Sequence, residues 1–142
     1  MTVDQQLDRF LEAQELNYPI ALKEIQKGTK RSHWMWYIFP QINGLGSSST
    51  SRYYAIKNLH EATAYLQHAM LGSRLLEITN VLLSLPATDP IQVFGRPDDA
   101  KLKSCMTLFA QVPNSNPAFQ AVLDKFFEGK PDLKTLDILN MG

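Results

Sequence analysis

The segment from His33 to Gln41, which reads HWMWYIFPQ, gathers side chains that could bind a small molecule. Trp34 and Trp36 provide flat rings for stacking, and the cations Lys30 and Arg31 come shortly before them. Two tryptophans one residue apart point to different sides of a helix, so at most one enters a core easily while the other lines a groove. Aromatic rings beside positive charge are suited to an anionic ligand with a flat ring, such as a nucleotide or an ADP-ribose-like molecule.

The candidate ligand contacts extend from this segment to two later parts of the chain. They are Lys30, Arg31, His33, Trp34, Trp36, Gln41, Arg52, Tyr53 and Lys101. Arg52 and Tyr53 follow a Gly- and Ser-rich run, NGLGSSSTS, that could form a lid or an anion-binding nest. Lys101 lies about one helical turn after Asp98, a spacing at which the two side chains could orient a substrate. If the site is catalytic, His33 is the candidate acid or base, because the reference pKa of histidine lies near neutrality.

Each of these features also has an explanation in packing alone. Both tryptophans could be core residues around which helices wrap, and the serine run could be a solvated loop with its aromatic neighbours packed beneath it. Asp98 and Lys101 could form an exposed ion pair on a helix. The same aromatic residues are also typical of protein interfaces. The sequence therefore leaves two functions open, a pocket for an anionic small molecule and a protein-interaction or self-association module, and it predicts no particular reaction.

Several familiar kinds of site are not predicted. The run GLGSSST lacks the Gly-Lys-Ser/Thr ending of a phosphate-binding loop. His60 and His68 are roughly two helical turns apart, which is too far to share one metal ion without another ligand. Cys105 is expected to be a core residue rather than a nucleophile, because free cysteine is among the most buried residue types. We therefore predict neither a metal nor a cofactor.

Length and composition predict one domain covering residues 1–142, large enough to bury a core without a disulfide. Basic and acidic residues number 14 each, so the net charge is zero and no global field favours nucleic acid or a membrane surface. The single cysteine forms no internal disulfide, and the first residues, MTVDQQLDRF, lack the pattern of a signal peptide. No apolar run is long enough to span a membrane. We expect a soluble cytoplasmic protein without nucleic-acid or membrane partners, whose oligomeric state the sequence does not predict.

The periodicity of apolar residues predicts helices from one end of the chain to the other, and no segment alternates as a half-buried strand does. In the first part of the chain we expect one helix ending near Leu16, one from Pro19 to Gly28, and a short one between a capping Ser32 and Pro40. The middle part is expected to form a helix opened by Asn58 and Glu61 with His68 in its last turn, a helix carrying the apolar seam Leu71 to Leu85, and a turn or helix at IQVFG. The last helices are expected from Pro97 to Phe109, from Asn116 to Gly129, and after a capping Asp132. The fold class is thus all-α, a compact irregular domain of about seven or eight helices.

The sequence resembles a family of uncharacterised bacterial and fungal proteins, domain of unknown function 1810, which is typified by a mycobacterial conserved hypothetical protein. The matching stretches, which cover nearly the whole chain, are RFLEAQ at 9–14, KRSHWMWYIFPQINGLGSSS at 30–49, YAI at 54–56, EATAYLQHAMLGSRL at 61–75, VFGRPDDAKLKSCMTLF at 93–109 and FFEG near Phe126. The chain has His68-Ala69 and Ser104-Cys105 where the family more often has His-Pro and Ser-Ser. The resemblance implies an all-α fold and no established activity or ligand.

Overall fold

The computed structural model describes residues 2–141, with the exception of the Asp4 side chain. This part of the chain folds into nine helices and contains no strand, only an isolated bridge between Ile42 and Ile56. The helices are α1 (Val3–Gln26), α2 (Met35–Ile38), α3 (Ser49–Tyr54), α4 (Leu59–Gln67), α5 (Ala69–Ser84), α6 (Pro90–Phe94), α7 (Asp98–Ala110), α8 (Ala118–Phe127) and α9 (Leu133–Met141). The predicted all-α class is confirmed.

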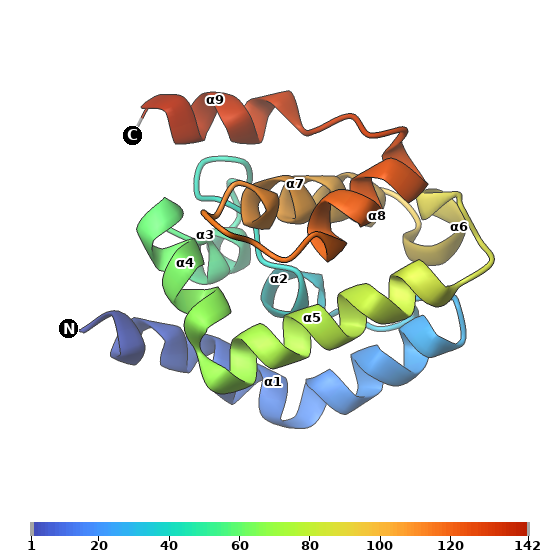
Figure 1. The fold of residues 1–142 in the computed structure, drawn as a ribbon. Coiled ribbons are helices and arrows are strands. Elements are labelled where there is room, and N and C mark those ends of the chain that lie inside the picture. Colours follow the sequence, from blue (N-terminus) through green and yellow to red (C-terminus); the bar gives the residue numbers. More distant parts are fainter. Residues whose placement is uncertain (1, 142) are drawn as a thin grey trace.

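The core lies where α8 packs on both α5 and α7, with α1 alongside α5 (Figure 1). The predicted apolar seam of α5 is buried at Leu71, Leu75, Ile78 and Leu82, because residues three and four apart share one helix face. Helix α7 is enclosed by α4, α6, α8 and α9, and its residues from Ser104 to Phe109 are all buried. Over the described residues, no helix is long and apolar enough to cross a membrane.

The first helix is longer than the sequence predicts. We expected one helix to end near Leu16 and another to begin at Pro19, but α1 is continuous and Pro19 lies inside it. Pro19 lacks the N–H that would bond to the carbonyl of Glu15, and both residues are exposed, so water can take that place. Tyr18 and Ala21 on the opposite face are buried, and their packing holds the helix together across the proline. The prediction of two helices was therefore wrong.

The helix starts were predicted with mixed success. Asn58 accepts a hydrogen bond from the Glu61 N–H and opens α4, and Asp132 accepts one from the Thr135 N–H and opens α9, as expected. Ser32 does not cap α2, which begins at Met35 without a side-chain cap. The run NGLGSSSTS forms a loop only up to Ser48, which caps the short helix α3; the rest of the run belongs to that helix. His68 does not lie within α4; its Nδ1 accepts hydrogen bonds from the first turn of α5.

Candidate functional site

The two tryptophans lie in different environments, as their spacing predicts. Trp34 is completely buried and donates its indole Nε1–H to Glu24 Oε1 at 2.9 Å. Trp36 is half-buried and faces a cavity on the other side of α2. Trp34 therefore belongs to the scaffold, and Trp36 is the ring that a ligand can reach.

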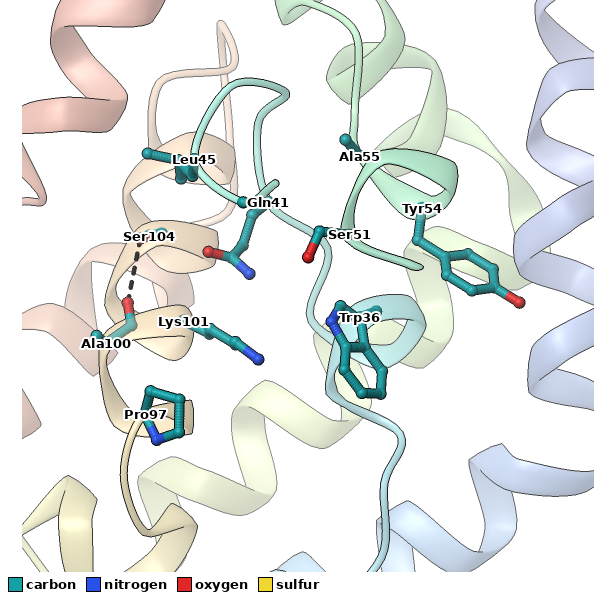
Figure 2. Close-up of a pocket in the computed structure, with 11 residues that line it drawn as sticks. Trp36, Gln41, Leu45, Ser51, Tyr54, Ala55, Pro97, Ala100, Lys101 and Ser104 are labelled. Atoms are coloured by element: carbon teal, nitrogen blue, oxygen red, sulfur yellow. Dashed lines mark hydrogen bonds between the residues drawn. The ribbon is translucent and has the colours of Figure 1, made fainter. Parts of the chain in front are cut away.

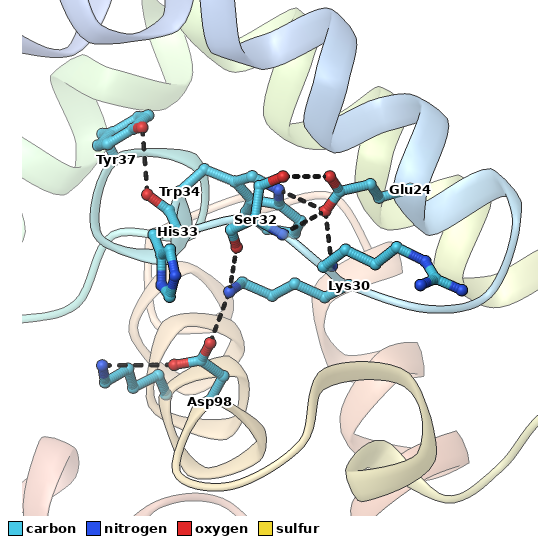
Figure 3. A network of polar contacts seen from close by, with 9 residues as sticks. Glu24, Lys30, Ser32, His33, Trp34, Tyr37 and Asp98 are labelled. Atoms are coloured by element: carbon cyan, nitrogen blue, oxygen red, sulfur yellow. Dashed lines mark hydrogen bonds and ion pairs between the residues drawn. The ribbon is translucent and has the colours of Figure 1, made fainter.

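The carboxylate of Glu24 organises the loop between α1 and α2. Its Oε1 accepts hydrogen bonds from the backbone N–H groups of Arg31 at 2.8 Å and Ser32 at 3.0 Å, as well as from Trp34. Its Oε2 accepts the hydroxyl of Ser32 at 2.5 Å (Figure 3). Burial acts to raise the pKa of Glu24, but these donors outweigh it and lower the pKa to about 2. Glu24 is thus an anion that fixes the backbone leading into the aromatic segment.

Asp98 at the start of α7 holds two lysines at once. Its Oδ2 lies 2.8 Å from Lys30 Nζ and its Oδ1 lies 3.4 Å from Lys101 Nζ (Figure 3). Each ammonium lies 5.0 Å from the centroid of a tryptophan ring, Lys30 over Trp34 and Lys101 over Trp36. The side chain of Lys30 is 7% exposed and that of Lys101 is 25% exposed. Lys30 is therefore a buried structural cation, whereas Lys101 can meet a ligand.

A cavity of about 190 Å³ lies between α2, α3 and α7 (Figure 2). Its walls include Trp36 from α2, Gln41 and Leu45 from the loop that follows, Ser51 and Tyr54 from α3, and Lys101 and Ser104 from α7. Three sequence candidates, Trp36, Gln41 and Lys101, therefore meet at one place although they come from separate parts of the chain. These three side chains combine a flat ring, an amide and a cation.

Two hydrogen-bonding groups in the walls are not used within the protein. Among the described residues, none forms a hydrogen bond with the Gln41 amide or with the indole N–H of Trp36. The two serine hydroxyls are already engaged: Ser51 shares a hydrogen bond with Ser48 at 2.7 Å, and Ser104 lies 3.1 Å from Ala100 O and 3.2 Å from Asp132 Oδ2. The hydroxyl of Tyr54 points away from the cavity (Figure 2). An amide, an indole N–H and an ammonium therefore remain to bind an acceptor in the cavity.

The other sequence candidates do not converge on this cavity. His33 and Arg31 are exposed on the loop before α2, and neither lines it. Arg52 donates to the carbonyl of Ser47 at 2.9 Å and, with Tyr53, lines a separate, larger and more open hollow of about 980 Å³ beside α1. Within residues 2–141 no group of three His, Cys, Asp or Glu side chains is placed to hold a metal ion.

One ion pair that supports the cavity wall was not predicted from the sequence. Arg9 Nη2 lies 3.0 Å from Glu61 Oε1, and the same guanidinium donates to the carbonyls of Tyr53 at 2.8 Å and Ala55 at 2.9 Å. Arg9 therefore ties α1 to the end of α3 and to the start of α4. A basic residue directly before Phe10, on the apolar side of a helix, was the available signal.

Cys105 is buried in α7, as the sequence predicts, and burial raises the pKa of its thiol. The native protein is therefore expected not to react with Ellman's reagent at pH 8 over several minutes, because neither the thiolate nor access to it is available. The same sample in concentrated guanidinium chloride should release one equivalent of the coloured product. Rapid labelling of the native protein would show that α7 opens or that Cys105 is not buried in solution.

Comparison with known proteins identifies the family. The profile described as "Protein of unknown function (DUF1810)" matches residues 4–139. The crystal structure of the conserved hypothetical protein Rv1873 from Mycobacterium tuberculosis is similar to this fold with a TM-score of 0.92 and 45% sequence identity, over 94% of this chain and 96% of that chain. Among curated proteins, none matches. The chain therefore belongs to the DUF1810 family of proteins of unknown function.

Proposed function

We propose that the cavity between α2, α3 and α7 binds a small anionic molecule that carries a flat ring, the class to which nucleotides belong. The observation that carries this proposal is the meeting of Trp36, Gln41 and Lys101 at one cavity. The ring of Trp36 offers a stacking surface, and Lys101 supplies the positive charge beside it. Gln41 adds a hydrogen-bonding amide that no other described side chain engages.

Lys101 is the cation that can turn toward a ligand. It lies 3.4 Å from Asp98, whereas Lys30 lies 2.8 Å from the same carboxylate and also donates to Ser32 O at 2.5 Å. Because its contact with Asp98 is longer and its side chain is more exposed, the ammonium of Lys101 can bind an anionic ligand in addition to Asp98. Asp98 then acts as a positioning residue that keeps Lys101 over the ring of Trp36.

The size of the cavity limits how much of a ligand it can hold. Its volume of about 190 Å³ is below the roughly 300–1,000 Å³ of pockets that enclose drug-sized molecules. The cavity can therefore hold one ring and its substituents, and the rest of a larger ligand would extend over the surface. His33 lies outside this volume, so the proposal gives the protein a binding role and no reaction.

A thermal-shift titration tests this proposal. AMP, ADP-ribose and benzoate, which are all anions with a flat ring, are each added at millimolar concentration, and at least one is expected to raise the Tm. A ligand at about ten times its Kd stabilises the folded state by roughly 1.4 kcal/mol, which corresponds to about 3–6 °C at this chain length. Trp36→Ala and Lys101→Met are expected to abolish the shift.

His33→Ala is the matched control, because this exposed side chain belongs to the same segment but lies away from the cavity. It is expected to retain the full ligand-induced shift. If none of the three compounds stabilises the protein at millimolar concentration, the proposed pocket function is wrong for this class of ligand.

A self-association surface is the second candidate, because the same region exposes aromatic side chains. Tyr53 is 57% exposed, and its ring lies 4.8 Å from that of Tyr54, centroid to centroid. Trp36, Tyr37 and these two tyrosines line an open hollow. Light scattering distinguishes the candidates: a stable dimer that Trp36→Ala dissociates supports the interface, and a monomer supports the pocket.

We also propose that the protein works in the cytoplasm. The support is its cysteine usage: Cys105 is the only cysteine of the chain and is buried in the core as a thiol. Proteins of reducing compartments use cysteine in this way, whereas small secreted domains tend to be rich in disulfides.

A further inference from the structure

We infer that the ligand of this cavity carries a single carboxylate attached directly to its flat ring. The inference rests on the pocket function proposed above and narrows its ligand to one chemical class. Three independent features support it: the charge at the cavity, the distance between Lys101 and Trp36, and the available volume.

The charged residues at the cavity suit a ligand with a single negative charge. Among the described residues that line it, only Lys101 carries a charge. Just behind the wall lie Lys30 and two carboxylates, those of Asp98 and Asp132, the second of which accepts the hydroxyl of Ser104. A single carboxylate on the ligand pairs with Lys101 and brings no second negative charge toward them. A phosphate dianion would keep one negative charge uncompensated in a partly desolvated site, and the cavity offers no arginine fork to hold it.

The position of Lys101 over Trp36 indicates that the negative group of the ligand is bonded directly to the ligand's ring. Lys101 Nζ lies 5.0 Å from the centroid of the Trp36 ring. The ammonium lies over the face of that ring, so it already covers part of the surface on which a ligand ring would stack. A ligand ring that stacks there, with its centroid about 4.5–7 Å from that of Trp36, shares the face with the ammonium and lies next to it. A carboxylate bonded to the ring reaches Lys101 directly, whereas the phosphate of a nucleotide is separated from its base by the sugar.

The remaining donors suit the two oxygens of a carboxylate. Figure 2 shows the amide of Gln41 and the ammonium of Lys101 ending in the same space, opposite Trp36 and Ser51. One carboxylate oxygen can accept from Lys101 and the other from the Gln41 amide, which otherwise has no partner among residues 2–141. The volume of about 190 Å³ holds one such ring and no complete nucleotide.

The two indole N–H signals of the protein provide a direct test by ¹H–¹⁵N NMR. Only two tryptophans are present, so two indole signals are expected, and Trp36→Phe assigns them. The Trp34 signal serves as an internal reference, because its N–H is buried on Glu24. Benzoate is titrated against benzamide, which has the same ring without the charge, and against cyclohexanecarboxylate, which has the charge without the flat ring.

Benzoate is expected to shift the Trp36 signal and leave that of Trp34 in place. Benzamide and cyclohexanecarboxylate are each expected to bind at least about tenfold more weakly. Lys101→Met is expected to weaken benzoate binding by at least about tenfold while leaving benzamide binding unchanged, since only the charged contact is lost. The Trp34 signal in this variant reports that the fold is intact.

The other outcomes separate the two proposals. If benzamide binds as well as benzoate, or if inorganic phosphate shifts Trp36 as strongly, the carboxylate inference is overturned and the pocket remains. If AMP shifts Trp36 at lower concentration than benzoate, the ligand is a nucleotide and the inference is again overturned. If none of these probes moves the Trp36 signal, both the inference and the proposed pocket function fail.

Discussion

Replacing Gly72 with alanine is expected to destabilise the protein by about 2–3 kcal/mol or more, although alanine is the better helix former. Gly72 lies in the first turns of α5, where the backbone passes close to the end of α4. A Cβ added at Gly72 would lie 2.1 Å from the carbonyl oxygen of Leu66 and 2.9 Å from its carbonyl carbon. These are backbone atoms, which cannot turn aside as a side chain does. The helix-propensity gain of about 1 kcal/mol does not offset the displacement of two packed helices.

Urea denaturation measures this loss, and Ser73→Ala provides the control in the same helix. Ser73 is exposed, so its replacement is expected to change the free energy of unfolding by less than about 0.5 kcal/mol. If Gly72→Ala cannot be purified in folded form under conditions in which Ser73→Ala can, that result is the extreme form of the expected loss. A Gly72→Ala variant as stable as the wild type would mean that α4 and α5 do not approach this closely in solution.

The parts of the fold that could be predicted depend on interactions between residues near one another in sequence. The seam of α5 follows from the helical period, and the caps at Asn58 and Asp132 follow from side chains that bond to N–H groups three residues ahead. These signals reside in a few consecutive residues. They identified most of the helices and several of their starts.

The predictions that failed depend on distant contacts. A proline that begins a helix and one that lies within it have similar local sequences, so Pro19 could not be placed without its surroundings. Tyr18, next to it, donates its hydroxyl to the carbonyl of Arg74 in α5 at 3.0 Å and anchors α1 across the proline. Ser32 has the residue type of a cap, but the Glu24 carboxylate takes its hydroxyl. In each case a tertiary partner decided the outcome.

In the candidate site, too, the features that depend on nearby residues were predictable and those that depend on distant contacts were not. The separation of Trp34 from Trp36 was predictable, because it needs only the direction of successive side chains in a helix. Their partners were not predictable. Asp98 pairs with Lys30 although about half of the chain separates them in sequence, and no spacing rule links them. The sequence therefore located the segment that carries the proposed site, but it named more cations than line the cavity, because it could not tell which of them face away or are held by other residues.

Replacing Glu24 with glutamine is expected to lower the free energy of unfolding by about 2–4 kcal/mol at pH 7. All four groups that bond to the Glu24 carboxylate are donors: two backbone N–H groups, the hydroxyl of Ser32 and the indole N–H of Trp34. Glutamine keeps the size of the side chain but loses the charge and turns an NH₂ group toward these donors. Glu15→Gln, an exposed position in the same helix, should be neutral.

The same carboxylate makes stability depend on pH in a defined direction. Its pKa falls from the ordinary 4.5 to about 2 in the folded protein, so the unfolded chain takes up a proton more readily. The stabilisation by Glu24 is therefore complete above about pH 5 and is lost progressively as the pH falls from 4.5 toward 2. Urea midpoints measured at pH 7, 4 and 2.5 should show the gap between wild type and Glu24→Gln closing as the pH falls. A gap that stays constant would mean that the charge of Glu24 contributes nothing and that its hydrogen bonds survive protonation.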